Sequence, residues 1–396
     1  MDKNFRTNGY RVIDFTLYKS NVDKLRREWK RHVKLIPEYP GGFRGRGIVM
    51  CAGGLGYFTC CWIAVKAIRR LGCMLPIEVW YVGKELSEEV RAQLRELEVE
   101  CKDFLEHGAD RVSGYRLKPL AILKSGFREV LYLDADNVCV KNPTDLFGTA
   151  EYAATGALFW PDFWRTEKDN PIWAIIGSEE YDTMEQESGQ VLIDKERCWK
   201  ELNLCQFFND RCDVYYRLLL GDKDTFRFAW MALKTPFHMI RTEVATCGYR
   251  HPDTNRFIGV TMVQHNPRGE PCFLHRNLLK WDITRPRERA WQKIRRFKPE
   301  AILKEYHINF AWELGHAFMD IQGEVEEVDF RELVGDIEDI FLDILRQLRN
   351  SAIYARYIMH LHFARHRLEP ASVQVQEQQI SPDSDYIGAL DEKFVV

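Results

Sequence analysis

The stretch EVLYLDADNVCV, residues 129–140, runs from an apolar segment directly into two aspartates, Asp134 and Asp136. Its apolar part, residues 129–133, has the length and composition of a buried strand. Two carboxylates placed two residues apart at the end of a strand can both bind one cation, and their hard oxygens suit Mg²⁺ or Mn²⁺. A cation held there would offset negative charge that grows on a leaving phosphate group. The alternative is that both aspartates only cap the strand and turn the chain.

Strand-like and helix-like segments alternate upstream of this stretch. Residues 47–54 (GIVMCAGG) and 77–82 are apolar runs typical of buried strands, whereas 57–71, 86–100 and 118–125 have helical spacing. This alternation predicts a parallel, Rossmann-like α/β sheet with helices between its strands.

Two of the predicted strands end in residues suited to ligand binding. The aspartate pair follows one strand, and Ala52, Gly53 and Gly54 follow another. In sheets of this kind ligands bind at the carboxyl ends of the strands. Minimal side chains let the backbone approach a nucleotide closely, although a plain tight turn has the same composition. We therefore expect a nucleotide to bind along this edge of the sheet.

The chain is expected to fall into four segments of different character. The prediction is a helical N-terminal segment at 1–40, an α/β domain at 41–285, a helical extension at 286–368 and a loose polar tail at 369–396. Within the α/β domain, short strands are expected at 153–159, 190–193 and 260–264.

Composition excludes some classes of function. The 396 residues are 45% hydrophobic and 29% charged, which is typical of a globular protein that can bury a large core. A net charge of -3 argues against a general nucleic-acid binder, because phosphate contacts require a basic surplus. No apolar run approaches the roughly 20 residues that span a bilayer.

The first 20 residues lack the pattern of a signal peptide. The 11 cysteines are never spaced as CxxC, so a zinc site is not expected, and most lie in apolar runs as small buried side chains. There is also no Asn-x-Ser/Thr acceptor for glycosylation. We expect a reduced, cytoplasmic protein, with a Golgi-type lumen as the alternative if a membrane anchor lies outside this sequence.

The aspartate pair also fits a different enzyme chemistry. An apolar strand followed by DxDx(T/V) resembles the haloacid-dehalogenase phosphatases, in which the first aspartate is a nucleophile. Asn137 and Val138 satisfy that pattern, and GDKD at 221–224 would be a later acidic motif. However, more than a hundred residues of α/β pattern precede the pair, whereas the phosphatase nucleophile ends the first strand.

A closer resemblance covers residues 118–147. This segment resembles the glycogenin-like GT-A transferases, including a lysine, Lys118, that precedes the first aspartate by sixteen residues. In those enzymes the lysine contacts the phosphates of the donor, and the resemblance implies this role for Lys118. The alternative is an ordinary solvated lysine at the start of a helix.

Several further motifs resemble the fungal-type α-mannosyltransferases of glycosyltransferase family seventy-one, in the order of that family. They are GIVMCAGG, LKPLAILKSGFREVLYLDADNVCVKNPTDLF, ALFWPDFW, ESGQVLIDK, GDKDTFRFAW and FLHRN, and they cover roughly residues 45–280. The resemblance implies a GT-A fold, a Mn²⁺ or Mg²⁺ cofactor, GDP-mannose as donor and a glycan or other hydroxyl as acceptor, with retention of configuration. A UDP-sugar is the alternative donor, because the base contacts near residues 45–60 do not identify the nucleotide.

The resemblance assigns roles around the donor sugar. Glu187 is the candidate nucleophile, or it stabilises the oxocarbenium-like centre electrostatically. Gly189 permits close approach, and Gln190 would bind sugar hydroxyls. Asp222 is a candidate base for the acceptor and Asp224 a hydroxyl ligand, although both also suit a helix start.

Two tryptophans and two histidines remain to be placed. Trp160 and Trp164 would wall the sugar pocket and Asp162 would bond a hydroxyl, with core packing of the tryptophans as the alternative. A third metal ligand is expected from His275, and His265 would then contact phosphate or acceptor.

A non-catalytic glycan-binding relative is the remaining alternative. The presence together of Lys118, both aspartates, Glu187 and His275 argues against it, because a decayed site would have lost some of them. No nucleic-acid partner and no membrane span are expected, and the oligomeric state is open.

Overall fold

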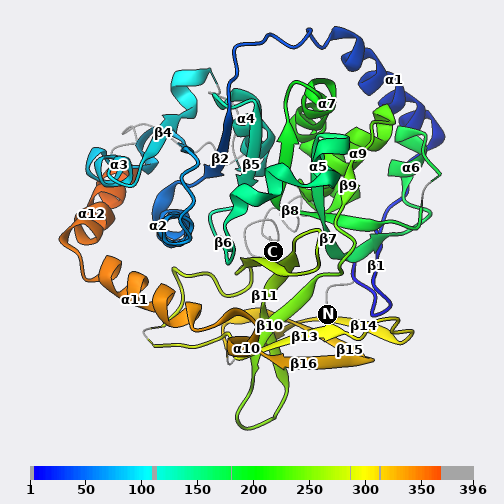
Figure 1. Cartoon of the computed structure of the whole chain (residues 1–396). Coiled ribbons are helices and arrows are strands. Elements are labelled where there is room, and N and C mark those ends of the chain that lie inside the picture. The colour runs from blue at the N-terminus through cyan, green and yellow to red at the C-terminus, as the bar shows by residue number, and fades with distance from the viewer. Residues whose placement is uncertain (1–3, 109–113, 180, 286, 312–313, 367–396) are drawn as a thin grey trace, which may run out of the picture.

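The computed structural model describes residues 4–108, 114–179, 181–285, 287–311 and 314–366. These residues form one mixed sheet and one antiparallel sheet, with helices packed around the first of them (Figure 1). The predicted α/β fold of GT-A type is thereby confirmed.

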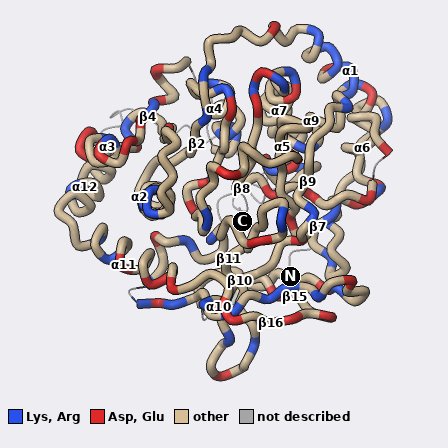
Figure 2. The backbone as a smooth tube through the Cα atoms, in the orientation of Figure 1, with Lys and Arg blue, Asp and Glu red and all other residues tan. Residues whose placement is uncertain are grey.

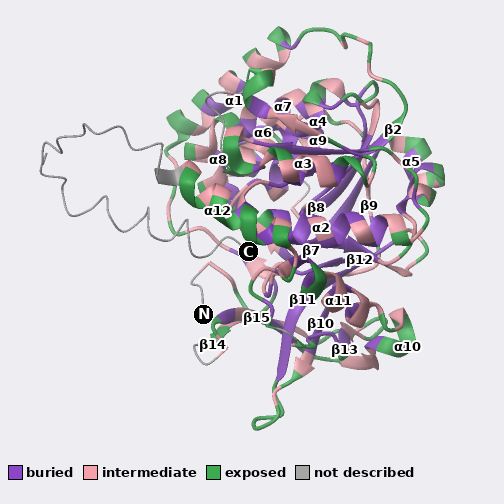
Figure 3. Ribbon diagram, turned by 90° about the vertical axis from the view of Figure 1, so that its left-hand side faces the viewer, coloured by how far each residue is buried: buried purple, intermediate pink, exposed green. Residues whose placement is uncertain are grey.

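The first sheet runs in the order β1-β7-β8-β5-β2-β3-β4, and β9 pairs with β7. Its strands are β1 (Tyr10–Arg11), β2 (Arg46–Cys51), β3 (Ile77–Tyr81), β4 (Val99–Asp103), β5 (Glu129–Leu133), β7 (Ala157–Thr166), β8 (Met184–Asp194) and β9 (His238–Met239). Strands β2 to β5 are parallel, as predicted, whereas β8 runs antiparallel to both β5 and β7. The central strands are almost entirely apolar and buried because helices cover both of their faces (Figure 3).

Three helices connect the parallel strands, close to where helical spacing predicts them. They are α2 (Gly54–Arg70), α3 (Glu88–Arg95) and α4 (Leu117–Lys124). The helix expected at 86–100 is shorter than predicted, because Glu98 has a positive φ of 58° that ends the turn and Val99 begins β4. The strand expected at 153–159 also differs, since α5 (Ala150–Thr155) fills its first half and Gly156 separates the helix from β7.

The remaining helices of the first layer pack on the side of β7 and β8. They are α1 (Lys19–Leu35), α6 (Pro171–Ile176), α7 (Trp199–Asp210), α8 (Cys212–Leu219) and α9 (Lys223–Leu233). Helix α1 lies within the segment expected at 1–40, which also contains β1. Its Trp29 is buried against α6 and donates from Nε1 to the Ile175 carbonyl at 2.8 Å.

The second sheet runs in the order β14-β15-β11-β10-β13-β16, with β12 pairing to both β11 and β6. Its strands are β6 (Asn137–Cys139), β10 (Ala245–Arg250), β11 (Phe257–His265), β12 (Pro271–His275), β13 (Lys293–Phe297), β14 (Lys304–Ala311), β15 (His316–Gly323) and β16 (Val325–Asp329). Strand β6 directly follows the aspartate pair, so the chain passes from the first sheet to the second at Asp134 and Asp136.

The helical extension predicted at 286–368 is wrong for its first half. Residues 293–329 form β13 to β16, which pair along the edges of β10 and β11 and so satisfy backbone groups that an open edge would expose. The second sheet therefore joins strands from both sides of the expected boundary at residue 285. The second half is helical, as predicted, with α10 (Phe330–Val334), α11 (Ile337–Arg349) and α12 (Ala352–His366).

The C-terminal helices pack against the first sheet's layer of helices. Tyr354 of α12 lies 2.9 Å from the Thr59 hydroxyl of α2, and the Tyr357 hydroxyl donates to the Glu85 carbonyl. No described helix is long and apolar enough to cross a membrane. The tail predicted to be loose, 369–396, lies outside the described residues.

Candidate active site

The predicted nucleotide edge is formed by the neighbouring strands β2 and β5. The two strands are parallel and pair Ile48 with Leu131, so their carboxyl ends lie side by side. Residues 52–54 follow one strand and Asp134 follows the other. Gly54 has a φ of 69° at the start of α2, a conformation that favours glycine, and the N-terminus of α2 offers free backbone N–H groups to an anion.

Asp134 lies at this edge and is hydrogen-bonded to groups from α4, β5 and β8. Its carboxylate accepts from Lys118 Nζ at 3.1 Å and from the Tyr132 hydroxyl at 3.0 Å, and its backbone N–H donates to the Gly189 carbonyl at 2.8 Å. Burial raises the pKa of the Asp134 carboxyl above its usual value, and the charge of Lys118 only partly offsets this effect. A bound cation would remove that penalty.

Asp136 contacts two basic side chains. Its oxygens lie 3.2 Å from His275 Nε2 and 3.0 Å from Lys280 Nζ. Burial opposes the charge on Asp136, but Lys280 and His275 outweigh it and hold the pKa of the carboxyl below its usual range. Asp136 is therefore an ionised, nearly buried carboxylate whose charge is balanced by His275, at the end of β12, and by Lys280, which follows that strand.

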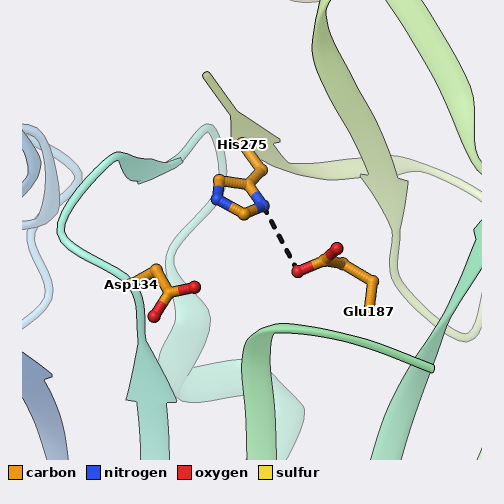
Figure 4. Close-up of side chains that lie close together, drawn as sticks. All are labelled: Asp134, Glu187 and His275. Atoms are coloured by element: carbon orange, nitrogen blue, oxygen red, sulfur yellow. Dashed lines mark ion pairs between the residues drawn. The ribbon is translucent and has the colours of Figure 1, made fainter. Parts of the chain in front are cut away.

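His275 reaches the site because β12 pairs with β6, which places it opposite Asn137. Its Nδ1 lies 3.4 Å from Glu187 Oε1 and has no hydrogen-bond partner among the residues that the structure describes (Figure 4). Burial disfavours a charged imidazole, but the Asp136 and Glu187 carboxylates outweigh it and raise the pKa of His275 to about 10. The proton on His275 thus occupies the place in the charge balance that a metal ion would take.

A metal ion fits the residues present. Asp134, Glu187 and His275 each offer one ligand atom, and these atoms all lie within 4.8 Å of one another. Two carboxylates and one imidazole suit Mn²⁺ or Mg²⁺. The expected set was Asp134, Asp136 and His275, so the structure supports two members of it and adds Glu187 as a competitor of Asp136 for the third position.

Glu187 lies across the strand pair from Asp134, because antiparallel β8 pairs Gln190 with Leu133. Its Oε1 accepts from the Gly189 N–H at 2.5 Å. Burial opposes the charge on Glu187, but His275 and Lys118 outweigh it and lower its pKa to about 2. An ionised carboxylate is what a nucleophile or an electrostatic stabiliser requires.

Lys118 joins this cluster to Asp222. Its Nζ lies 3.1 Å from Asp222 Oδ2, 3.1 Å from Asp134 Oδ2 and 2.9 Å from Ser188 Oγ. The Lys118 ammonium, carried by α4, thus contacts groups at the end of β5, in β8 and at the start of α9. The alternative, an ordinary solvated lysine, is contradicted because Lys118 is buried.

Gly189 and Gln190 also lie in the site. A Cβ on Gly189 would lie 2.6 Å from His275 Nδ1, so only glycine allows the imidazole this close. Gln190 is fully buried; its Oε1 accepts from Asn137 Nδ2 at 2.6 Å, while its Nε2 has no partner among the described residues.

Asp162 and Asp224 belong to a second, adjoining cluster centred on Lys223. Lys223 Nζ lies 2.8 Å from Asp162 Oδ2, 2.6 Å from Glu185 Oε2 and 3.1 Å from Asp224 Oδ2. Burial raises the pKa of Asp162 to about 6, with Lys223 opposing this shift. Asp162 remains a candidate sugar ligand.

Asp224 is fully buried, and protein groups occupy its carboxylate. Oδ1 accepts from the Gln186 N–H and Arg227 Nε, both at 3.0 Å. These contacts anchor α9 on β8 and leave the predicted sugar contact of Asp224 without support in the geometry. Asp222, by contrast, is the N-cap residue of α9, but its side chain makes no capping hydrogen bond. Its carboxylate contacts Lys118 instead.

The tryptophans and His265 are core residues. Trp160 is fully buried and donates from Nε1 to the His265 carbonyl at 2.8 Å, and Trp164 packs against Tyr306. The core-packing interpretation therefore holds for both tryptophans. His265 is buried too, and burial lowers its pKa to about 4. Of the two histidines, the structure brings His275 alone to the aspartate pair.

Two charged residues of the site, Lys280 and Glu85, were not among those predicted from the sequence. Lys280 lies five residues after His275 and contacts Asp136, and its Nζ lies 4.9 Å from the Tyr57 ring. The basic residue within HRNLLK was a usable signal for it. Glu85 follows β3, and a Cβ on Gly53 would lie 2.0 Å from its Oε2. Its carboxylate thus lies against the small-residue turn, a proximity that no local pattern indicates.

The Mannosyl_trans3 family model, described as a mannosyltransferase, matches residues 45–186 and 178–266, more than half of the chain. The chain belongs to this mannosyltransferase family. Membership contradicts the phosphatase alternative.

Curated relatives of the chain are fungal. The α-1,2-mannosyltransferase MNN24 of Candida albicans is 27% identical over 62% of this chain and 41% of its own length. MNN2 of Saccharomyces cerevisiae is 24% identical over 62% of this chain and 50% of its own length. The chain thus spans about half the length of the relatives it matches.

Two solved structures are also similar. A complex of the galactosyltransferase LgtC with donor and acceptor sugar analogues is 16% identical, covers 48% of this chain and 70% of its own, and has a TM-score of 0.34. Mouse xyloside xylosyltransferase 1 is 18% identical, covers 49% and 85%, and has a TM-score of 0.35.

Proposed function

We propose that this chain is a metal-dependent, retaining α-mannosyltransferase that moves mannose from GDP-mannose to a hydroxyl of a glycan. One observation carries the proposal: in a member of a mannosyltransferase family, Asp134, Glu187 and His275 converge at the edge of the sheet where a nucleotide is expected. The names of its relatives specify α-1,2 linkages, and we propose the same linkage here.

Asp134 and His275 would hold the metal in either ligand set. When bound, the metal would supply positive charge that offsets the negative charge of the leaving group. Lys118 and Lys280 flank the aspartate pair with one ammonium on each side. From these positions both ammonium groups could contact the phosphate oxygens and stabilise the departing nucleotide.

Glu187 and Asp222 serve the sugar in this proposal. Glu187 is ionised and faces the space between Asp134 and His275, where it can stabilise positive charge at the anomeric carbon or attack it. Asp222 lies 3.1 Å from Lys118 and 3.3 Å from Ser188 Oγ, and as a base it would take a proton from the acceptor hydroxyl.

Glu85 supports guanine over uracil as the base of the donor. Its carboxylate lies against Gly53, within the expected nucleotide edge, and one oxygen accepts from the Val82 N–H at 2.9 Å. A carboxylate accepts two parallel hydrogen bonds from the N1–H and N2–H₂ groups of guanine, whereas uracil offers one N–H donor. Glu85→Gln should therefore weaken GDP binding and leave UDP binding as it was.

The function is tested by thermal shift against GDP, UDP and their sugars, with and without Mn²⁺. Metal-dependent stabilisation by GDP and GDP-mannose alone is expected. Stabilisation by UDP alone would make the chain a UDP-sugar transferase. Indifference to every nucleotide would refute the proposal.

A further inference from the structure

Lys and Arg residues recur along helix α1 (Figure 2). The exposed basic residues of this helix are Lys19, Lys24, Arg27, Lys30, Arg31 and Lys34. Lys24 lies 3.9 Å from Glu28, whereas the other five form no ion pair with any residue that the structure describes. These six residues are here called the basic face.

The opposite side of α1 fixes the direction in which the basic face points. Leu25 and Trp29 are buried against α6 and α7, and Arg26 Nε donates to the Ala174 carbonyl at 3.0 Å. The helix therefore cannot roll to hide its charges without breaking these contacts. Figure 1 places α1 at the outer edge of the molecule, beside α6.

The basic face is unfavourable for the helix itself. Arg27 and Arg31, like Lys30 and Lys34, are i,i+4 pairs of equal charge, which repel each other. Lys19 lies in the first turn, where a positive charge opposes the helix dipole. The whole chain carries a net charge of -3, so this concentration of positive charge is local. The helix dipole favours Lys34 in the last turn, but the two like-charge pairs and Lys19 do not stabilise the helix.

Large apolar side chains flank the basic face at both ends of the helix. Tyr18, directly before α1, is 81% exposed, and Leu35, its last residue, is 73% exposed. A basic helix face with exposed apolar residues at its margins is the composition of an element that lies on a lipid surface, where the charges contact anionic headgroups and the apolar groups enter the interface.

We propose that α1 docks this protein on an anionic phospholipid surface through the basic face, with Tyr18 and Leu35 entering the headgroup region. A soluble polyanion would need only the charges and would give no part to the two apolar side chains. The docking is independent of the sugar-transfer chemistry, because no residue of α1 belongs to the candidate active site.

Co-sedimentation with phosphatidylcholine vesicles, with and without phosphatidylserine, tests the proposal. Binding is expected only to the vesicles that contain phosphatidylserine, and it should fall when the ionic strength is raised from about 0.05 to about 0.5 M. Replacing Arg27, Lys30, Arg31 and Lys34 together by Gln should weaken that binding at least about 50-fold. Glutamine keeps the helix propensity, so a matching thermal melt shows that the variant is folded.

A matched control removes the same charge from scattered sites. It replaces Arg70, Lys84, Lys124 and Lys298 by Gln, all of them exposed and none on α1. The control should bind vesicles within about threefold of the parent, because its positive charges are not on the docking face. Equal losses in both variants would show a general effect of net charge and overturn the proposal.

A second variant separates a lipid surface from other anionic partners. Tyr18→Ser with Leu35→Ser should weaken vesicle binding several-fold while leaving retention on a heparin column unchanged. Strong retention of the parent on heparin without any vesicle binding would identify an acidic macromolecule as the partner and overturn the proposal.

Discussion

At the scale of single residues, the site is a balance of buried charges. Asp136 and Glu187 share the His275 imidazole between them, with contacts at 3.2 and 3.4 Å. A metal-binding imidazole coordinates the metal with one nitrogen and donates a hydrogen bond to a carboxylate with the other. Asp136 lies beside one nitrogen and Glu187 beside the other, so only one of them can share the metal with His275. The other is left for a different role.

Two matched variants decide between these carboxylates. We expect Asp136→Asn to weaken Mn²⁺ binding at least about tenfold and to abolish transfer, because it removes a ligand charge. Glu187→Gln should abolish transfer while Mn²⁺ affinity, measured by calorimetry with GDP present, stays within about threefold. The reverse pattern of affinities would make Glu187 the third ligand and remove it from the sugar chemistry.

Lys195 makes a pH-dependent contribution to stability away from the active site. It is buried, its Nζ donates to the Ser125 carbonyl at 2.7 Å, and burial lowers its pKa to about 7. The unfolded chain binds this proton up to a pH near 10, so between about pH 7 and 10 the unfolded state holds more protons and stability rises with pH. The free energy of unfolding should therefore increase over this range.

Lys195→Met tests this contribution. Denaturant unfolding at several pH values should show a shallower rise for the variant between about pH 7 and 10 than for the parent. Parallel curves for parent and variant would mean that Lys195 stays charged in the folded protein.

At the scale of elements, α11 is hydrogen-bonded to the segment that follows β12 and carries part of the site. Glu338 of α11 accepts from Arg276 Nη1 at 3.2 Å and from the Ala290 and Trp291 N–H groups at 2.8 and 2.9 Å. Arg276 is fully buried, follows His275 directly and lies 4.1 Å above the Trp281 ring. The C-terminal helices thus brace the segment that carries His275 and Lys280.

Removing Glu338 should loosen this segment. Glu338→Ala leaves a buried guanidinium and two N–H groups without their acceptor, so we expect a loss of about 3–5 kcal/mol in the free energy of unfolding. Glu332→Ala, a substitution on exposed α10 nearby, should change stability by less than about 0.5 kcal/mol. Chemical unfolding of both variants measures the difference. Similar values would show that the Glu338 hydrogen bonds contribute little to stability.

At the scale of the whole molecule, the active site is shared by two sheets. Asp134 and Glu187 come from the first sheet, while His275 and Lys280 come from β12 and the segment that follows it. A ligand that binds both groups must therefore stabilise the contact between the sheets. Global unfolding is the readout that reports this coupling.

Mn²⁺ with GDP should raise the melting temperature of the whole protein. At a ligand concentration of about a hundred times Kd, the gain is about 2.7 kcal/mol. His275→Ala should abolish the part of the increase that depends on metal, because it removes the ligand from the second sheet. An unchanged metal effect in this variant would place the cation on the first sheet alone.

Local patterns in the sequence were sufficient for much of the fold and part of the site. Alternating apolar and helical periods predicted β2, β3, β5 and the helices between them, because these patterns depend on residues within one turn or one strand. The resemblance predicted that Lys118 contacts the donor phosphates, and the structure places it 3.1 Å from Asp134. The polar alternation of 293–329 was mistaken for helical period, since short strands rich in charged residues carry a weak signal.

The sequence by itself determined that this chain is an α/β protein with an aspartate pair at the carboxyl end of a central strand, and its motifs placed it among mannosyltransferases. Only the tertiary structure decided which residues meet there. His275 and Asp136 are 139 residues apart and meet because β12 pairs with β6. The same packing buries Trp160 and Asp224, which their motifs alone could not distinguish from exposed ligands. Strand pairing and burial depend on contacts between distant segments, so no local window of sequence contains them.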